Sequence, residues 1–207
     1  PASVLVIGAG VAGMAAVRLS RGMGAEVVLL DQSISKLRYA SEQMGGSLVT
    51  ELIQDSVLKN RLQHVDVVIG ALSPKEGRTP MVVSEEMVEL MPVGSVIIDI
   101  SIDSGGCFET SEITSHAEPT FVIHDVLHYC VPNMNSAVGN TSSIAMSNIV
   151  GPMLLQLSEN GGVKESLHFD LNIRAGLYLY GGLLTKRHLG EHFDLPYSSD
   201  ELLFGNL

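Results

Sequence analysis

The chain has 207 residues, 45% of them hydrophobic, and a net charge of −11 from 23 acidic and 12 basic side chains. This length predicts one large domain, or one domain with a smaller unit. The acidic balance, without a basic cluster, argues against nucleic acid and anionic membranes as partners. No apolar run is long enough to span a bilayer, and Cys107 and Cys130 form no close-spaced metal or redox motif. We therefore expect a reduced, cytoplasmic setting and no metal site.

Near the N-terminus an apolar, β-branched stretch, residues 4–7, leads through a G-x-G-x-x-G motif directly into a helix-forming segment. Gly8 permits a tight turn, Gly10 lets a pyrophosphate approach the backbone, and Gly13 lets the helix pack on the strand. The helix start directs free N–H groups and about half a unit of positive charge at the phosphates. The motif predicts a dinucleotide site, with a glycine-rich packing turn as the alternative. The predicted phosphate-binding residues are Gly8, Ala9, Gly10, Val11, Ala12 and Gly13.

A second expected strand, residues 26–30, ends next to Asp31, whose carboxylate is suited to accept hydrogen bonds from the adenosine ribose. It would repel a 2′-phosphate, because a like-charge contact near 4 Å costs about 1 kcal/mol in water and about 4 kcal/mol at intermediate dielectric. The sequence therefore favours NAD over NADP. Alternatively, Asp31 caps the next helix, although Ser33 or Ser35 could do so. Lys36 either flanks the adenosine or is a solvated surface base.

The remaining chain alternates strand and helix patterns, which predicts a Rossmann-type, doubly wound α/β fold with a mostly parallel sheet. A strand is expected at 120–124, and the stretch 124–134 is expected to lead into a loop. A long apolar helix over residues 136–157 is expected to kink or break at Gly151-Pro152. We place a NAD-binding domain at 1–136 and a helical C-terminal segment at 137–207. The other expected helices are 14–23, 34–44, 51–63, 84–90, 163–169 and 185–192, and the other expected strands are 47–50, 65–72 and 95–100.

Two further stretches carry candidate functional residues. Asp103 follows the strand at 95–100 and precedes Gly105-Gly106, so it either faces the nicotinamide ribose and the reacting carbon or caps its own loop. His124 and His128 are expected to be structural rather than metal ligands, because no third ligand stands nearby in the sequence.

These residues together resemble the C-terminal part of the alanine dehydrogenase / pyridine nucleotide transhydrogenase family. The resemblance rests on the glycine motif and on residues 22–25, 30–31, 68–71, 99–109 and 124–134, of which the last two favour the alanine dehydrogenase branch. It implies NAD-dependent, reversible oxidative deamination of L-alanine to pyruvate and ammonia. It also implies that Asp103 is the active-site aspartate and Asp31 the adenosine-ribose acid. The cofactor-lining positions it implies are Ala71, Leu72, Ile100, Val131, Asn133 and Met134.

The chain departs from this family at Pro132 and His128, where members often carry Ala and Phe, and Pro132 removes one backbone N–H. The resemblance implies that the family's substrate-binding Arg and Lys and its catalytic His lie in an N-terminal domain, which we expect this chain to lack. We therefore expect the chain to bind NAD without turning over alanine, its small amino-acid or keto-acid substrate. We expect the C-terminal segment to pack on that domain, and exposed apolar residues to drive homo-oligomer formation. The alternatives are a transhydrogenase subunit, another amino-acid dehydrogenase of the family, or a non-catalytic NAD-sensing module.

Overall fold

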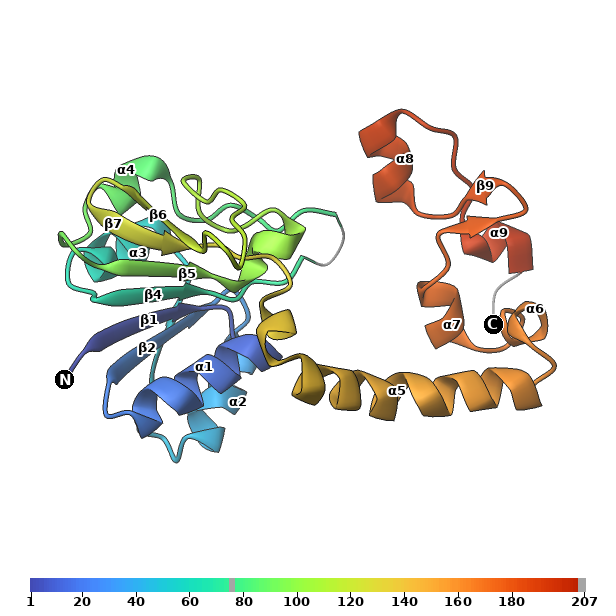
Figure 1. Ribbon diagram of the computed structural model, residues 1–207, viewed down its shortest axis with the longest axis horizontal. Helices are drawn as coiled ribbons and strands as arrows, with labels where there is room; N and C mark the ends of the chain where they lie inside the picture. The colour runs from blue at the N-terminus through green and yellow to red at the C-terminus, as the bar shows by residue number, and fades with distance from the viewer. Residues whose placement is uncertain (75–76, 205–207) are drawn as a thin grey trace. The chain divides into compact units, whose positions relative to one another are not determined.

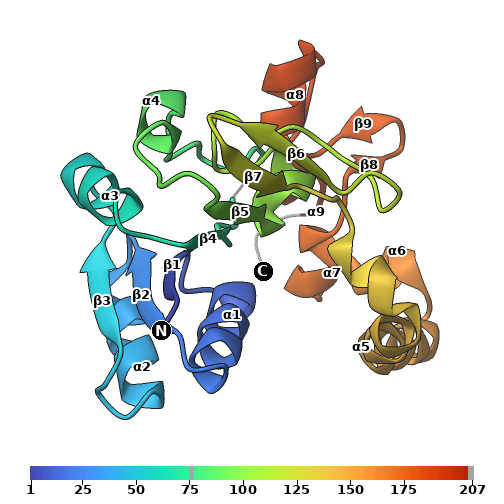
Figure 2. The ribbon, with the colours of Figure 1, turned by 60° about the vertical axis from the view of Figure 1, so that its left-hand side comes forward.

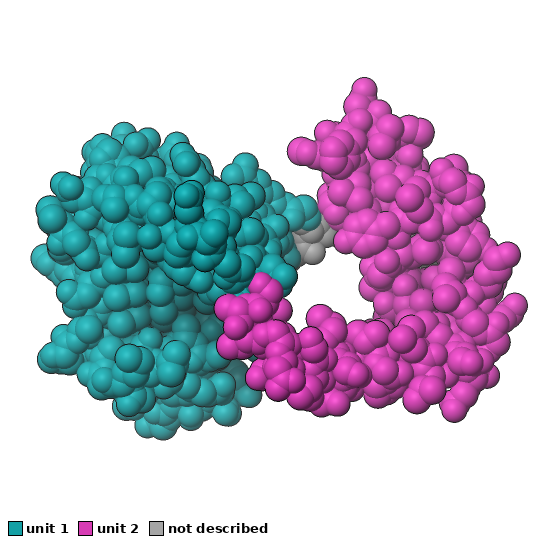
Figure 3. All heavy atoms as spheres, viewed as in Figure 1, with its two compact units in different colours: residues 1–134 teal, residues 135–207 magenta. Residues whose placement is uncertain are grey.

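The computed structural model describes residues 1–74 and 77–204 and divides the chain into two compact units, Pro1–Met134 and Asn135–Leu207 (Figure 3). We refer to them as unit 1 and unit 2. The sequence placed this boundary two residues later, between residues 136 and 137. In the described ranges, the helices are too short or too polar for a membrane span.

A seven-stranded sheet in the order β3-β2-β1-β4-β5-β7-β6 forms the centre of unit 1 (Figure 1). Neighbouring strands are parallel except at one edge, where β6 runs antiparallel to β7. The chain reverses its winding direction between β1 and β4, and open α/β sheets bind ligands at such switch points. The strands are β1 (Ser3–Ile7), β2 (Glu26–Asp31), β3 (Val49–Leu52), β4 (Val67–Gly70), β5 (Val96–Asp99), β6 (Thr120–Ile123) and β7 (Val126–Tyr129).

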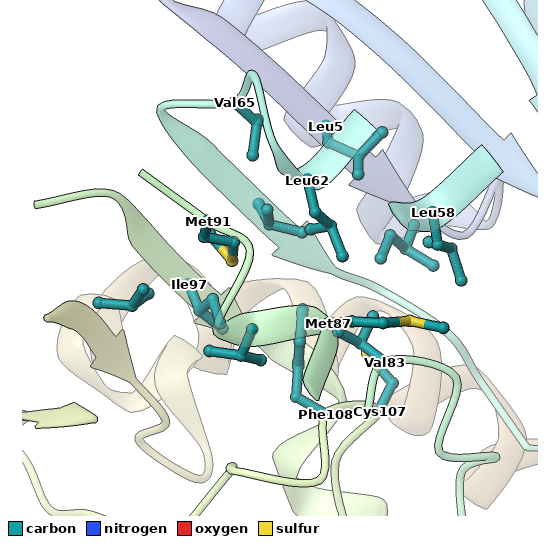
Figure 4. Close-up of a cluster of buried hydrophobic side chains, with 14 of the residues drawn as sticks. Leu5, Leu58, Leu62, Val65, Val83, Met87, Met91, Ile97, Cys107 and Phe108 are labelled. Carbon is teal, nitrogen blue, oxygen red and sulfur yellow. The ribbon is translucent and has the colours of Figure 1, made fainter. Parts of the chain in front are cut away.

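Helices cover both faces of this sheet (Figure 2). Alternate residues of β1 explain why, because Val4 and Val6 belong to one buried cluster while Leu5 and Ile7 belong to another. The first cluster includes Met14 and Val17 of α1 and Leu37 of α2. The second includes Leu58 and Leu62 of α3 and Met87 of α4 (Figure 4). The helices are α1 (Val11–Gly22), α2 (Ile34–Gln43), α3 (Asp55–Leu62) and α4 (Glu85–Val88).

The fold prediction is confirmed, with two corrections in unit 1. The stretch 124–134, which was expected to lead into a loop, contains a strand that was not predicted, β7. The alternation of β7 was hidden by a histidine at a buried position, and the β6–β7 turn uses His124 and Asp125 at positive φ rather than the usual glycine or asparagine. The helix expected from residue 51 begins only at Asp55, because Glu51 and Leu52 pair with β2.

Unit 2 begins within the 3-10 helix η2 (Met134–Val138). The long helix α5 (Gly139–Glu159) follows and continues through Pro152 without the expected break. A proline removes one hydrogen bond, here to the carbonyl of Asn148, and this residue is exposed, so water can satisfy the carbonyl. The segment is also not purely helical, because it contains a short hairpin. The remaining elements of the unit are α6 (Val163–Ser166), α7 (Leu171–Ala175), β8 (Leu179–Tyr180), β9 (Leu183–Leu184), α8 (Arg187–Phe193) and α9 (Asp200–Phe204).

Candidate functional site

The glycine-rich loop between β1 and α1 needs glycine at two positions for steric reasons. Gly8 adopts φ +115°, and a β-carbon there would overlap the carbonyl oxygen of Ala71. A β-carbon on Gly13 would overlap the carbonyl oxygen of Gly8, so this glycine lets α1 start close above the loop. At Gly10, in contrast, no atom of the described residues lies within 4 Å of a β-carbon position. The loop therefore leaves open space at Gly10, where the sequence predicts a pyrophosphate.

Asp31 lies at the carboxyl end of β2 and joins the glycine loop to the start of α2. The residue is 6% exposed. Its Oδ2 accepts a hydrogen bond from the Ala9 N–H at 2.7 Å, and its Oδ1 accepts one from the Ser33 N–H at 2.8 Å. The helix cap is Ser33, whose Oγ accepts a hydrogen bond from the Lys36 N–H at 3.4 Å. The capping role proposed as an alternative for Asp31 is thus filled by Ser33.

A cleft of about 1050 Å³ opens beside this loop, between the carboxyl ends of β1, β2 and β4. Its volume suits a ligand of dinucleotide size. Of the residues predicted to bind cofactor, those that line it are Gly8, Gly10, Asp31, Lys36, Ala71 and Leu72. The helix start beside it carries Val11, which is 93% exposed, and the first-turn amides of such a helix have no partner inside the helix. The cleft therefore combines N–H donors, one carboxylate and small strand tips.

Arg78 also lines this cleft, as a cation besides Lys36, and was not predicted from the sequence. Arg78 follows β4, and its Nη2 donates a hydrogen bond to the Gly105 carbonyl at 3.0 Å. It also covers Gly105, where a β-carbon would lie 2.5 Å from the arginine Nε. A single arginine in a polar loop belongs to no periodic pattern. Only its position after the small residues at the end of β4 could have indicated Arg78 in the sequence. The other lining residues not predicted are Gln32, Ser33, Ser73, Pro74 and Pro80.

A second group of predicted residues lies at the carboxyl ends of β5 and β7. Asp103 is exposed in the 3-10 helix η1 (Ile100–Ser104), and its Oδ1 accepts a hydrogen bond from the Asn133 N–H at 2.8 Å. Asn133 lies 30 positions further along the chain and adopts φ +50°. The structure thus brings the predicted catalytic residue and one predicted cofactor contact together. The other predicted positions of this region are Ile100 and Met134, which are partly buried, and Val131, which is 1% exposed.

The two histidines singled out in the sequence have protein partners. His128 is buried, its Nδ1 donates to the Val126 carbonyl at 2.9 Å, and its Nε2 lies 2.8 Å from the Thr110 Oγ1. Burial lowers the pKa of His128, while the Val126 carbonyl acts to raise it. His124 Nε2 lies 2.8 Å from Glu85 Oε1. In residues 1–74 and 77–204, no group of three or more His, Cys, Asp and Glu could hold a metal ion.

Both cysteines are buried free thiols. Burial raises the pKa of the Cys130 thiol and raises that of Cys107 well above its usual value, with the nearby Asp99 carboxylate adding to the effect at Cys107. Thiolates are the reactive form of cysteine. Neither thiol is therefore suited to nucleophilic chemistry.

A parallel sheet with this strand order, joined at its centre to a helix by a glycine-rich loop, defines a Rossmann-type nucleotide-binding domain. The family described as "Alanine dehydrogenase/PNT, C-terminal domain" matches residues 1–187, and the chain belongs to this family. The family binds pyridine nucleotides, which agrees with the class of cofactor that the motif predicts.

Curated relatives carry the name alanine dehydrogenase. One from Halomonas elongata is 40% identical over 205 residues, which cover 99% of this chain and 55% of that protein. Another, from Mycolicibacterium smegmatis, is 39% identical over 198 residues, 96% of this chain and 53% of that protein. The chain therefore spans about half the length of the curated relatives it matches.

Solved structures agree. One described as L-alanine dehydrogenase superposes with a TM-score of 0.83 at 32% identity, covering 94% of this chain and 53% of that one. A transhydrogenase from Sinorhizobium meliloti superposes with a TM-score of 0.69 at 23% identity, over 90% of this chain and 50% of that one. The second likeness concerns the fold alone.

Proposed function

We propose that unit 1 binds NAD(H) in the cleft beside the glycine loop. The observation that carries this proposal is the position of Asp31, which lines the cleft while two backbone amides fix its carboxylate. A carboxylate has about four lone-pair sites, so acceptor capacity remains for the ribose hydroxyls of an adenosine. Gly10 and the first turn of α1 would then hold the pyrophosphate, through the amides of Val11, Ala12 and Gly13.

NAD is preferred over NADP in this proposal because the same carboxylate would face a 2′-phosphate. The repulsion amounts to about 1–4 kcal/mol for charges near 4 Å, depending on the local dielectric. Lys36 and Arg78 also line the cleft and act in the opposite direction. Both are exposed on the described surface, however, so solvent screens them more than it screens Asp31.

We further propose that the chain is the cofactor-binding part of an L-alanine dehydrogenase, as the names of its relatives suggest. When bound, NAD supplies the hydride-accepting chemistry for deamination of an amino acid. Asp103 would contact the nicotinamide ribose, held in place by the Asn133 amide. The other residues proposed to line that half of the cofactor are Ala71, Leu72, Ile100, Val131 and Met134.

The substrate-binding groups of such an enzyme are expected in a further domain, so we propose that this chain alone binds NAD(H) and does not turn over alanine. Self-association is proposed as well. Unit 2 carries large exposed apolar side chains, including Ile149, Leu154 and Leu155 of α5, which are 60–68% exposed. Apolar patches of this kind mark interaction surfaces. A cytoplasmic setting stays a prediction.

The test is a fluorescence titration of the purified chain with NADH and with NADPH, followed by an assay with L-alanine and NAD. We expect NADH to bind at least about tenfold more tightly than NADPH, which corresponds to about 1.4 kcal/mol. We expect no alanine-dependent NADH formation. Binding of neither nucleotide would overturn the proposed site, and turnover would overturn the proposed division of labour between domains.

A further inference from the structure

A second aspartate, Asp99, lies at the end of β5 and is completely buried. Its Oδ1 accepts a hydrogen bond from the Ser101 N–H at 2.9 Å. Its Oδ2 accepts hydrogen bonds from the Cys107 N–H at 3.0 Å and from the Ser111 hydroxyl at 2.7 Å. In the described ranges no lysine, arginine or histidine pairs with this carboxylate. The Cys107 thiol lies 3.9 Å from Oδ1 as a fourth donor. Burying a carboxylate without a counter-charge costs free energy, so these donors need an explanation.

These donors bracket one turn. The Ser101 amide lies at the start of residues 101–107 and the Cys107 amide lies at the end, so a single carboxylate closes the segment. Gly105 and Gly106 inside it have φ +100° and +75°. A β-carbon on Gly106 would lie 2.7 Å from Asp99 Oδ2, so the turn is drawn tightly onto the carboxylate. Asp103 lies in the middle of this segment and is exposed.

We propose that Asp99 is a positioning residue of the nucleotide site: its buried carboxylate fixes residues 101–107 so that Asp103 meets the nicotinamide half of the cofactor. The inference rests on the proposed function, in which Asp103 contacts the nicotinamide ribose. Asp99 itself touches no ligand, because it is fully buried. Its effect passes through the backbone of the turn to Asp103. Arg78, which lines the cleft, donates a hydrogen bond to the Gly105 carbonyl of the same turn.

The electrostatics agree with this role. Burial raises the pKa of Asp99, while the hydrogen bonds from Ser111, Cys107 and Ser101 act to lower it. The ionised form accepts every one of these bonds, whereas a neutral amide at the same place cannot. In an Asp99→Asn variant the side-chain NH2 would face either the Ser101 N–H or the Cys107 N–H, so one end of the turn would lose its acceptor.

The experiment compares two ligands, NADH and ADP. ADP shares the adenosine and the diphosphate with NADH but lacks the nicotinamide and its ribose. We expect Asp99→Asn to weaken NADH binding about tenfold and to change ADP binding less than about twofold, because only the nicotinamide half depends on the turn. The matched control is Asp31→Asn, which should weaken both ligands because its carboxylate serves the adenosine half. Thermal unfolding of each variant reports on folding.

Equal losses of NADH and ADP affinity in Asp99→Asn, or no loss of either, would overturn the inference while leaving the proposed cofactor site intact. If the wild-type chain binds neither ligand, the proposed function itself fails. Should Asp99→Asn not fold, Ser111→Ala decides, because it removes one hydroxyl donor and leaves both amides in place. We then expect NADH binding to weaken about threefold with ADP binding unchanged, and an equal effect on both ligands would overturn the inference.

Discussion

Asp31 ends β2 and Asp99 ends β5, two strands of the same sheet that are separated by β1 and β4, and the two carboxylates are used in nearly the same way. Each accepts a hydrogen bond from the amide two residues ahead, Ser33 and Ser101 respectively. Each also accepts one from an amide next to a glycine-rich turn, Ala9 in one case and Cys107 in the other. In both places a strand-end aspartate fixes a loop that contains glycine at positive φ.

The difference lies in what the remaining acceptor capacity faces. Asp31 lines the cleft, so a ligand can reach it. Asp99 accepts a further hydrogen bond from the Ser111 hydroxyl and is completely buried beneath the Gly105-Gly106 turn. The same local chemistry therefore builds a binding residue at one strand end and a positioning residue at the other. Whether such an aspartate binds a ligand or positions a loop depends on whether the chain buries its remaining acceptor sites, rather than on the backbone amides that it binds.

If the cleft around Asp31 depends on close packing of the glycine loop, Gly13→Ala should have the largest effect on stability and on NADH binding. Its β-carbon would overlap the Gly8 carbonyl, and backbone has to move to make room. We expect a loss of about 1–3 kcal/mol in the free energy of unfolding from overpacking. NADH binding should weaken about 100-fold, because a displacement near 1 Å can have that effect. Urea unfolding and NADH titration measure the two quantities.

Gly10→Ala is the matched control for this prediction. No described atom lies near its β-carbon position and its φ is −80°, so the variant should keep its free energy of unfolding within about 0.5 kcal/mol. The added methyl group would still occupy space proposed for the pyrophosphate. We expect NADH and ADP to weaken together, about tenfold. Unchanged affinity for both would show that the phosphates do not lie at Gly10.

A smaller effect should come from the charge on Asp31. Asp31→Asn removes the charge that faces a 2′-phosphate and nearly preserves the shape of the side chain. We expect the ratio of NADPH to NADH affinity to rise about tenfold, within the range given by Coulomb's law at intermediate dielectric. Paired titrations with the two nucleotides measure this ratio. If it stays constant, Asp31 does not face the adenosine ribose, and the likeness between Asp31 and Asp99 extends to their roles.

The role of Asp31 and its glycine loop could be predicted from the sequence, whereas the role of Asp99 and its turn could not. Gly8, Gly13 and Asp31 act through their neighbours in the chain or through one adjacent strand, so a spacing rule describes them. Asp99 accepts hydrogen bonds from the amides of Ser101 and Cys107, two and eight positions away, and no side chain marks these amides in the sequence. The hydrogen bond from Arg78 to the Gly105 carbonyl joins residues 27 positions apart and could not be predicted for the same reason. Contacts with backbone groups that no known motif spaces leave little trace in a single sequence.

The fold shows a similar pattern. Strongly apolar strands such as β1 were predicted within a residue or two, because burial on both faces produces continuous runs of valine, isoleucine and leucine. β7 was missed because buried His128 interrupts such a run. The hairpin β8–β9 of unit 2 was missed because its strands have two residues each, too short for any periodicity to appear.

The smallest and most selective effect is expected at His128, because its burial makes the stability of this region depend on pH. Burial lowers its pKa in the folded chain below the ordinary value of 6.5. Between that lowered pKa and 6.5 the unfolded chain binds more protons, so the free energy of unfolding rises with pH across this window. Acidification from pH 7.5 should therefore destabilise the chain as the pH falls below 6.5, until it passes the lowered pKa. Urea unfolding at several pH values measures the slope.

His128→Phe should remove this part of the pH dependence. At pH 7.5 the variant should be less stable by about 1–3 kcal/mol, because the buried Thr110 hydroxyl loses its partner. The deficit should narrow as the pH falls, since the variant has no imidazole to protonate. His64→Gln, at an exposed position, should leave the slope unchanged. If the free energy of unfolding of wild type and of His128→Phe fell in parallel on acidification, other groups would carry the acid sensitivity. The buried surroundings of His128 would then be no more sensitive to protonation than the cleft.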